Sequence, residues 1–241
     1  MSAHSQEDWF GIGAAPEKFP MTLHILLATA EPNSMVWVTD LHATLGLDNT
    51  ADIEKISYSE ERKLAYSAWG DHSFGIRDEF GRWQQENLNL SSPDAILESL
   101  NAFVRHMHQQ VPALNRSRGE VGFVLVTFLE NGPRIYFAVF APRPVIAPIE
   151  KNLWAGDDYS QAKIFIDYYY TLSKQTIEDA LLFGIHAMRL AHRVKFSYVG
   201  EPNAWVFRDR VFKRLGQSEL AEYIRTSQSL DAAIYALGSH D

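Results

Sequence analysis

Apolar and β-branched residues gather in three stretches near the start of the chain. Residues 22–30 read T-L-H-I-L-L-A-T-A, and residues 35–44 read M-V-W-V-T-D-L-H-A-T after a polar turn over residues 31–34. Two such runs around a turn of Pro, Asn and Ser predict a hairpin. A third β-rich run, K-I-S-Y-S-E-E-R-K-L-A-Y-S-A, opens at Lys55 and closes at Trp69-Gly70-Asp71. The first third of the chain is therefore predicted to be mostly β-strand.

Helical spacing replaces this pattern after residue 71. Over residues 71–87 the apolar positions that recur at roughly helical intervals are Phe74, Ile76, Phe80 and Trp83. Ser92 followed by Pro93 predicts the start of a second helix, with an apolar stripe at Ile96, Leu97, Leu100, Phe103 and Val104. Two strands, over residues 121–129 and 134–140, are then predicted around a turn at residues 130–133.

The second half repeats helices followed by strands. Asp157 or Asp158 is predicted to cap a helix that runs to Tyr168, and Ser173 to open another with Ile177, Ala180, Leu181, Ile185 and Met188 on one face. Two strands are expected over residues 203–207 and 210–215, followed by a tail helix from Gly216. The order of strands, two helices, strands, two helices and strands predicts an α+β fold.

Chemistry-bearing residues fall at the ends of the first predicted strands. Thr22 opens the first strand, Asp40 lies near the end of the second, Lys55 opens the third run, and Gly70 closes it. This layout resembles the proteasome β-subunit family of N-terminal-nucleophile hydrolases, whose chains begin with a nucleophilic threonine and continue to A-D-x-R-x-T, K-I and S-G segments. The resemblance covers roughly residues 21–215 and implies a four-layer αββα sandwich.

The resemblance assigns a role to each matching residue. A threonine hydroxyl needs a base, and a free α-amino group with a pKa near ~8 can serve when the threonine comes first. The family pattern therefore implies Thr22 as nucleophile, Lys55 as the proton-relaying cation, Asp40 as its carboxylate partner and the Gly70 N–H as oxyanion donor. By the same resemblance, the substrate pocket is expected at Ala43, Thr44, Ala68 and His72, with a mid-sized substrate side chain preferred.

Several positions depart from the family pattern. Thr22 follows Met21 instead of being the first residue, Trp69 stands in place of the serine of S-G, and acids at Asp157 and Asp158 replace expected serines. Two functions follow as alternatives. One is a threonine peptidase or amidase freed by removal of the residues before Thr22; the other is a catalytically silent subunit with a structural or binding role. We expect an extension over residues 1–20, the proteasome-like domain over 21–215 and a helical tail over 216–241.

Composition restricts the partners. With 241 residues, 46% of them hydrophobic, the chain can bury a core as one domain. A net charge of -8 disfavours nucleic acid, and the chain has neither cysteine nor an apolar run of the ~18 residues that span a bilayer. His106 and His108, like His186 and His192, lack metal-ligand spacing on a helix, and no glycine-rich phosphate loop is present. We therefore predict a cytoplasmic protein without metal or cofactor, with peptide substrates if active, and a homo-oligomer by resemblance.

Overall fold

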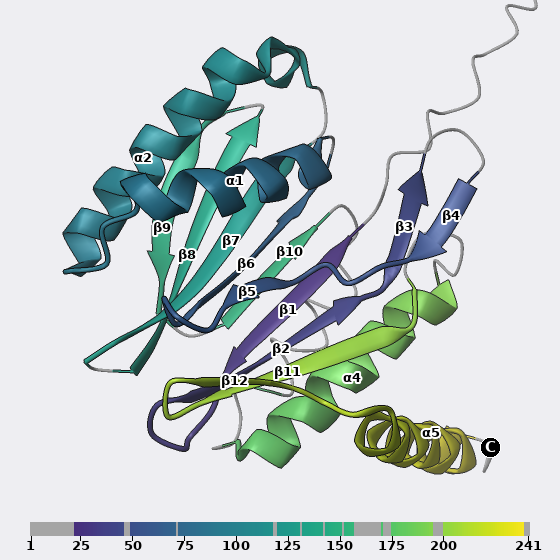
Figure 1. The fold of residues 1–241 in the computed structure, drawn as a ribbon. Helices are drawn as coiled ribbons and strands as arrows, with labels where there is room; N and C mark the ends of the chain where they lie inside the picture. Colours follow the sequence, from purple (N-terminus) through teal and green to yellow (C-terminus); the bar gives the residue numbers. More distant parts are fainter. Residues whose placement is uncertain are drawn as a thin grey trace, which may run out of the picture.

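The fold of this chain, given by a computed structural model, is built on two antiparallel sheets of five strands each (Figure 1). The described residues are 22–45, 49–70, 72–117, 120–130, 132–141, 143–150, 152–156, 170, 175–194 and 200–238. In strand order, the first sheet consists of β10 (Asn152–Gly156), β1 (Leu23–Ala28), β2 (Ser34–Asp40), β11 (Pro202–Arg208) and β12 (Val211–Arg214). The second consists of β5 (Ser57–Ser59), β6 (Leu64–Trp69), β7 (Val121–Leu129), β8 (Gly132–Ala141) and β9 (Val145–Ile149).

The β1–β2 hairpin forms where the apolar runs predict it. Its register pairs Leu26 with Trp37, and every residue of β2 is buried. Asn33 takes a left-handed conformation in the turn, with φ of 56°, which asparagine tolerates better than most residues. After β2 the chain makes a small separate ribbon from β3 (His42–Leu45) and β4 (Asn49–Asp52).

Helices α1 (Ser73–Asn87) and α2 (Pro93–Gln110) cover one face of the second sheet (Figure 1). Their apolar stripes pack on β6, β7 and β8 in one hydrophobic cluster with an aromatic centre at Phe80, Phe103 and Phe123. The Ser92 side chain accepts a hydrogen bond from the Ala95 N–H at 3.1 Å, so the predicted cap of α2 is confirmed. A short 3-10 helix (Pro112–Arg116) leads from α2 toward β7.

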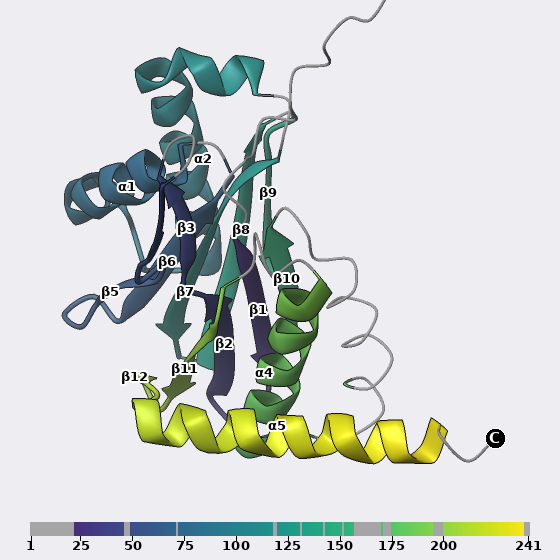
Figure 2. The same cartoon turned by 90° about the vertical axis from the view of Figure 1, so that its right-hand side faces the viewer.

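A second cluster, including Trp37, Trp69 and Phe207, lies between the two sheets. On the outer face of the first sheet, α4 (Ile177–Val194) packs on β1, β2 and β11. The last helix, α5 (Gln217–Gly238), crosses the end of α4 (Figure 2). Hydrogen bonds tie the two helices together, from His186 to Ser227 at 2.8 Å and from Arg193 to Asp231 at 3.0 Å.

The α+β class is confirmed. The two helices predicted after residue 71 are also confirmed, and in the chain they lie between β6 and β7. The sequence did not predict β9 and β10, and the residues just before Asp157 form strand β10, which pairs with β1. The expected helix from Asp157 to Tyr168 and the extension over residues 1–20 lie outside the described residues. No described helix has the length and apolarity to cross a bilayer.

Candidate active site

Thr22 immediately precedes β1 and lies at the edge where β1 meets β10. Only 6% of its surface is exposed. Gly156 of β10 lies opposite Leu23, and its φ of +130° belongs to a conformation that side chains rarely adopt. A Cβ atom built on Gly156 would fall 1.7 Å from the Thr22 carbonyl oxygen, so glycine is required for this close approach.

Asp40 and Lys55 form a buried ion pair next to Thr22. The Lys55 Nζ lies 2.7 Å from the Asp40 Oδ2, and the two side chains are 5% and 0% exposed. Asp40 also accepts the backbone N–H of Leu23 at 2.9 Å and that of Gly200 at 3.2 Å. These bonds replace much of the hydration that the carboxylate loses on burial, and they tie the end of β2 to the start of β1.

A buried histidine lies behind this pair, between the sheets. The His24 Nδ1 accepts the Trp37 Nε1–H at 3.3 Å, and the His24 Nε2 lies 3.2 Å from the Ser67 Oγ. The Ser67 hydroxyl donates its proton to a hydrogen bond with the Lys55 carbonyl at 2.7 Å. Its oxygen therefore accepts a hydrogen bond from the His24 Nε2–H. Burial, aided by the nearby Lys55 charge, lowers the pKa of His24 from 6.5 to about 3.

Because His24 is neutral when buried, stability should depend on pH. Between pH 6.5 and about 3 the unfolded chain binds a proton at His24 that the folded chain does not, so acidification favours unfolding. We expect the protonation of His24 in the unfolded chain to lower the free energy of unfolding by about 2 kcal/mol when the pH falls from 7.5 to 5. Urea unfolding at both pH values measures it, with His24→Gln as the control. An equal loss in that variant would contradict the assignment.

The turn after β6 links this site to α1. Gly70 has a φ of +80°, and a Cβ there would lie 2.3 Å from the Glu120 carbonyl oxygen. His72 follows in the left-handed conformation with an exposed side chain, and it makes no side-chain hydrogen bond to the helix it precedes. The Gly70 carbonyl accepts the Ser73 N–H at 3.2 Å. The role of the Gly70 N–H as an oxyanion donor stays a prediction.

A small cavity of about 10 Å³ lies against Thr22, lined by Thr22, Lys55, Ala68, Ser73, Phe74 and Arg77. The structure thus brings together three of the predicted site residues and adds three from the first turns of α1. His72 does not line this cavity, and the side chains of Ala43 and Thr44, in β3, lie outside those described. Sequence reasoning missed Arg77, because no pattern in the sequence shows that the first turns of α1 face Thr22.

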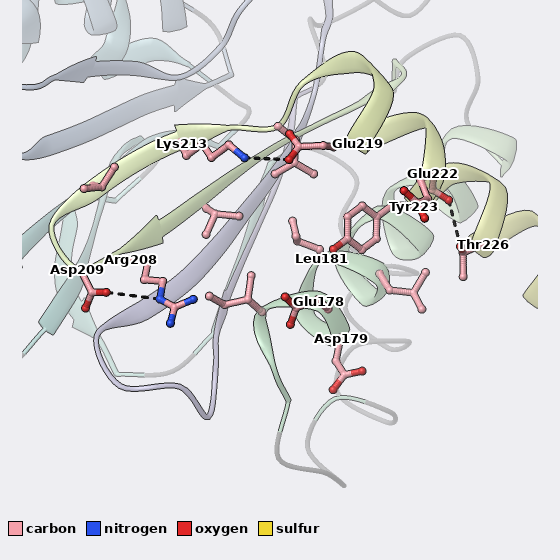
Figure 3. A pocket seen from close by; sticks show the side chains of 15 residues that line it. Glu178, Asp179, Leu181, Arg208, Asp209, Lys213, Glu219, Glu222, Tyr223 and Thr226 are labelled. Atoms are coloured by element: carbon pink, nitrogen blue, oxygen red, sulfur yellow. Dashed lines mark hydrogen bonds and ion pairs between the residues drawn. The ribbon is translucent and has the colours of Figure 1, made fainter.

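A pocket much larger than the cavity at Thr22 lies elsewhere, between α4, the β11–β12 hairpin and α5 (Figure 3). It encloses about 810 Å³, with an apolar floor that includes Leu181 and a rim that carries Glu178, Glu219 and Glu222. Burial raises the pKa of Tyr223, and these three carboxylates add to the shift. None of the Thr22 site residues lines this pocket. The candidate active site is therefore not identified by the size of its cavity.

His106 and His108 both lie on α2 and are half-buried. The His106 Nε2 lies 2.8 Å from the Glu79 Oε1, and this bond is the main cause that lowers the pKa of Glu79. Both ring nitrogens of His108 are buried and have no hydrogen-bond partner among the described residues. Within the same part of the chain, no three His, Asp or Glu side chains are grouped to hold a metal ion.

The fold is proteasome-like, as comparison with solved structures shows. Similar solved structures include Anbu proteins. Anbu from Hyphomicrobium sp. strain MC1 is 11% identical with a TM-score of 0.69, and Anbu (ancestral beta-subunit) from Yersinia bercovieri is 13% identical with a TM-score of 0.72. Each comparison covers 91% of this chain and 97% of the other. A scan of protein families and a search of curated proteins found no match.

These findings correct the family assignment made from the sequence. The likeness to Anbu proteins, at 11–13% identity, supports a proteasome-like fold but not membership of the N-terminal-nucleophile hydrolases. In this chain Thr22 follows Met21, so its nitrogen is a peptide amide rather than a free amine. The assignment to those hydrolases was therefore wrong, whereas the likeness in fold to proteasome-like structures is supported.

Proposed function

We propose that this chain is a catalytically silent proteasome-like subunit with a structural or binding role in a homo-oligomer. The observation that carries the proposal is the peptide bond between Met21 and Thr22. An amide nitrogen has no lone pair available for a proton, so the hydroxyl of Thr22 lacks the base that a free threonine amine would supply. The threonine hydroxyl is present, but the free amine that would act as its base is not.

The neighbouring basic groups do not fill this gap. The Lys55 ammonium donates to Asp40, and His24 is bonded to Trp37 and Ser67. The cavity at Thr22 has room for about one water-sized group, which leaves no space for a peptide backbone. These features support a site that retains its residues but does not turn over peptides.

The proposed architecture of the subunit is the four-layer αββα sandwich. Three separate clusters support it, one between α1–α2 and the second sheet, one between the sheets, and one between the first sheet and α4–α5. Assembly into a homo-oligomer is supported by the subunit named in one neighbour's description. Light scattering that returned the mass of one chain, 27.4 kDa, would contradict the assembly.

The second candidate is a threonine peptidase or amidase that becomes active when the residues before Thr22 are removed. One observation favours it: the Lys55–Asp40 ion pair lies beside Thr22 and is almost fully buried. Burying two charges is costly unless many hydrogen bonds compensate, and such a pair gives little net stability. Its presence next to a threonine hydroxyl fits a cation that assists that hydroxyl.

One experiment separates the two candidates. The full chain and a form that begins at Thr22, cut from a fusion, are incubated with an epoxyketone, which closes a ring through both the threonine hydroxyl and its amine. Intact mass then reports the adduct, and a fluorogenic peptide panel reports turnover. We expect neither label nor turnover from the full chain; either one would contradict the silent proposal.

The form that begins at Thr22 tests the second candidate. Labelling of that form, lost in its Thr22→Ala variant, would support the peptidase. If that form is folded but is not labelled, the catalytically silent subunit is the only candidate function that remains. Circular dichroism and the unfolding temperature establish that the shortened chain is folded before it is compared.

A further inference from the structure

The cavity beside Thr22 has an imbalance of charge. Lys55 is neutralised by Asp40, but among the described residues Arg77, whose side chain is 18% exposed, has no comparably close ion-pair partner. Its Nε lies 4.0 Å from the carboxylate of Asp78, and the Asp78 side chain is 65% exposed. Within the described part of the chain, the Arg77 Nε is buried without a hydrogen-bond acceptor.

The rest of the guanidinium is held in place. Its Nη1 donates to the Glu54 carbonyl oxygen at 2.7 Å, and its Cζ lies 5.4 Å from the centroid of the Phe74 ring. The Glu54 carboxylate is bonded to Asn203 and Arg214 instead. Arg77 is therefore oriented by a backbone acceptor and an aromatic face, which leaves its charge without a close carboxylate.

The position of Arg77 on α1 makes this imbalance larger. The first turn of α1, Ser73 to Ile76, carries no carboxylate, and the preceding His72 provides no side-chain cap. The positive end of the helix dipole thus lies next to a guanidinium, an unfavourable pairing unless an anion is present. Thr22 and Ser73, which each carry a hydroxyl, line the same cavity, and only 6% of the Thr22 surface is exposed.

We infer that this cavity is a binding site for a single carboxylate group, held by Arg77 and by the hydroxyls of Thr22 and Ser73. A volume of about 10 Å³ takes one carboxylate oxygen at its base, with the remainder of the ligand outside. A phosphate dianion fits less well, because it is bulkier and the buried Asp40 would repel its second charge. The inference goes beyond the proposed function and does not depend on bond cleavage at Thr22.

Isothermal titration of the full chain with small capped amino acids tests the site. N-acetyl-glutamate amide offers a side-chain carboxylate, N-acetyl-alanine offers a main-chain carboxylate, and N-acetyl-glutamine amide is the neutral control. We expect at least one of the carboxylates to bind about tenfold or more tightly than the glutamine amide, since hydrogen bonds to charged groups are stronger than neutral ones. Equal binding of all three probes, or none, would overturn the inference.

Substitution of Arg77 locates the site. Arg77→Gln should weaken the better carboxylate by about tenfold or more, and Arg77→Lys should recover only part of the loss because an ammonium lacks the planar fork. Arg82→Gln is the matched control, since Arg82 lies on the same helix, is 72% exposed and pairs with Glu79. Folding of each variant is checked by its unfolding temperature. Unchanged binding in a folded Arg77→Gln protein would overturn the assignment.

Discussion

Replacing Lys55 by methionine is expected to lower the free energy of unfolding by about 3–5 kcal/mol, because it leaves the carboxylate of Asp40 buried without its cation. The Asp40 side chain is 0% exposed, so water cannot take the place of the Lys55 Nζ. The two backbone N–H groups that Asp40 accepts supply only part of the lost stabilisation. Urea unfolding at pH 7.5, compared with the unsubstituted chain, measures the loss.

The matched control removes both charges. In the double variant Lys55→Met, Asp40→Asn, the asparagine oxygen can still accept the Leu23 N–H, and no uncompensated charge remains. We expect this variant to recover most of the stability lost in Lys55→Met, since buried ion pairs contribute little beyond their own desolvation cost. A single variant within about 1 kcal/mol of the parent chain would show that the carboxylate is not buried as described.

Replacing Gly156 by alanine is expected to cost about 3 kcal/mol or more, from the strained backbone and the overpacking together. The added Cβ would lie 1.7 Å from the Thr22 carbonyl oxygen, and this oxygen belongs to the backbone, so β1 and β10 would have to separate. Thermal and urea unfolding measure the cost. Because Thr22 would shift, we also expect weaker carboxylate binding in the cavity.

Gly75→Ala is the matched control for this substitution. Gly75 lies in the first turn of α1, and a Cβ there would meet no atom within 4 Å. Alanine favours helix by up to about 1 kcal/mol over glycine, so this variant should be as stable as the parent chain or more so. Similar losses from the two variants would mean that the close approach of β10 to Thr22 is not the cause.

Patterns in the sequence predicted those elements that are specified by residues close together in the chain. The β1–β2 hairpin forms around a four-residue polar turn, and α2 begins where Ser92 and Pro93 mark a cap. Strand β10 was missed for the opposite reason. β10 pairs with β1, more than a hundred residues earlier, and a short strand with so distant a partner has no local signal of its own.

The sequence also placed Thr22, Asp40 and Lys55 at the ends of successive strands, and the resemblance to proteasome β-subunits suggested that they meet. Their catalytic roles stay predictions, whereas their proximity is a property of the fold. Arg77 carried no such indication, because on a helix its spacing is that of an ordinary half-exposed position. Its charge matters only because the turn at Gly70 directs the first turn of α1 toward Thr22.

The sequence by itself thus determined the β1–β2 hairpin, the helices α1, α2 and α4, the strand ends that carry Thr22, Asp40 and Lys55, and the peptide bond that precedes the threonine. The tertiary structure alone decided which side chains share the cavity, how deeply the ion pair is buried and why Gly156 must be glycine. The physical reason is that periodicity and caps act between residues a few positions apart. Burial and close backbone approach depend on strands and helices that are distant in the chain and meet only on folding.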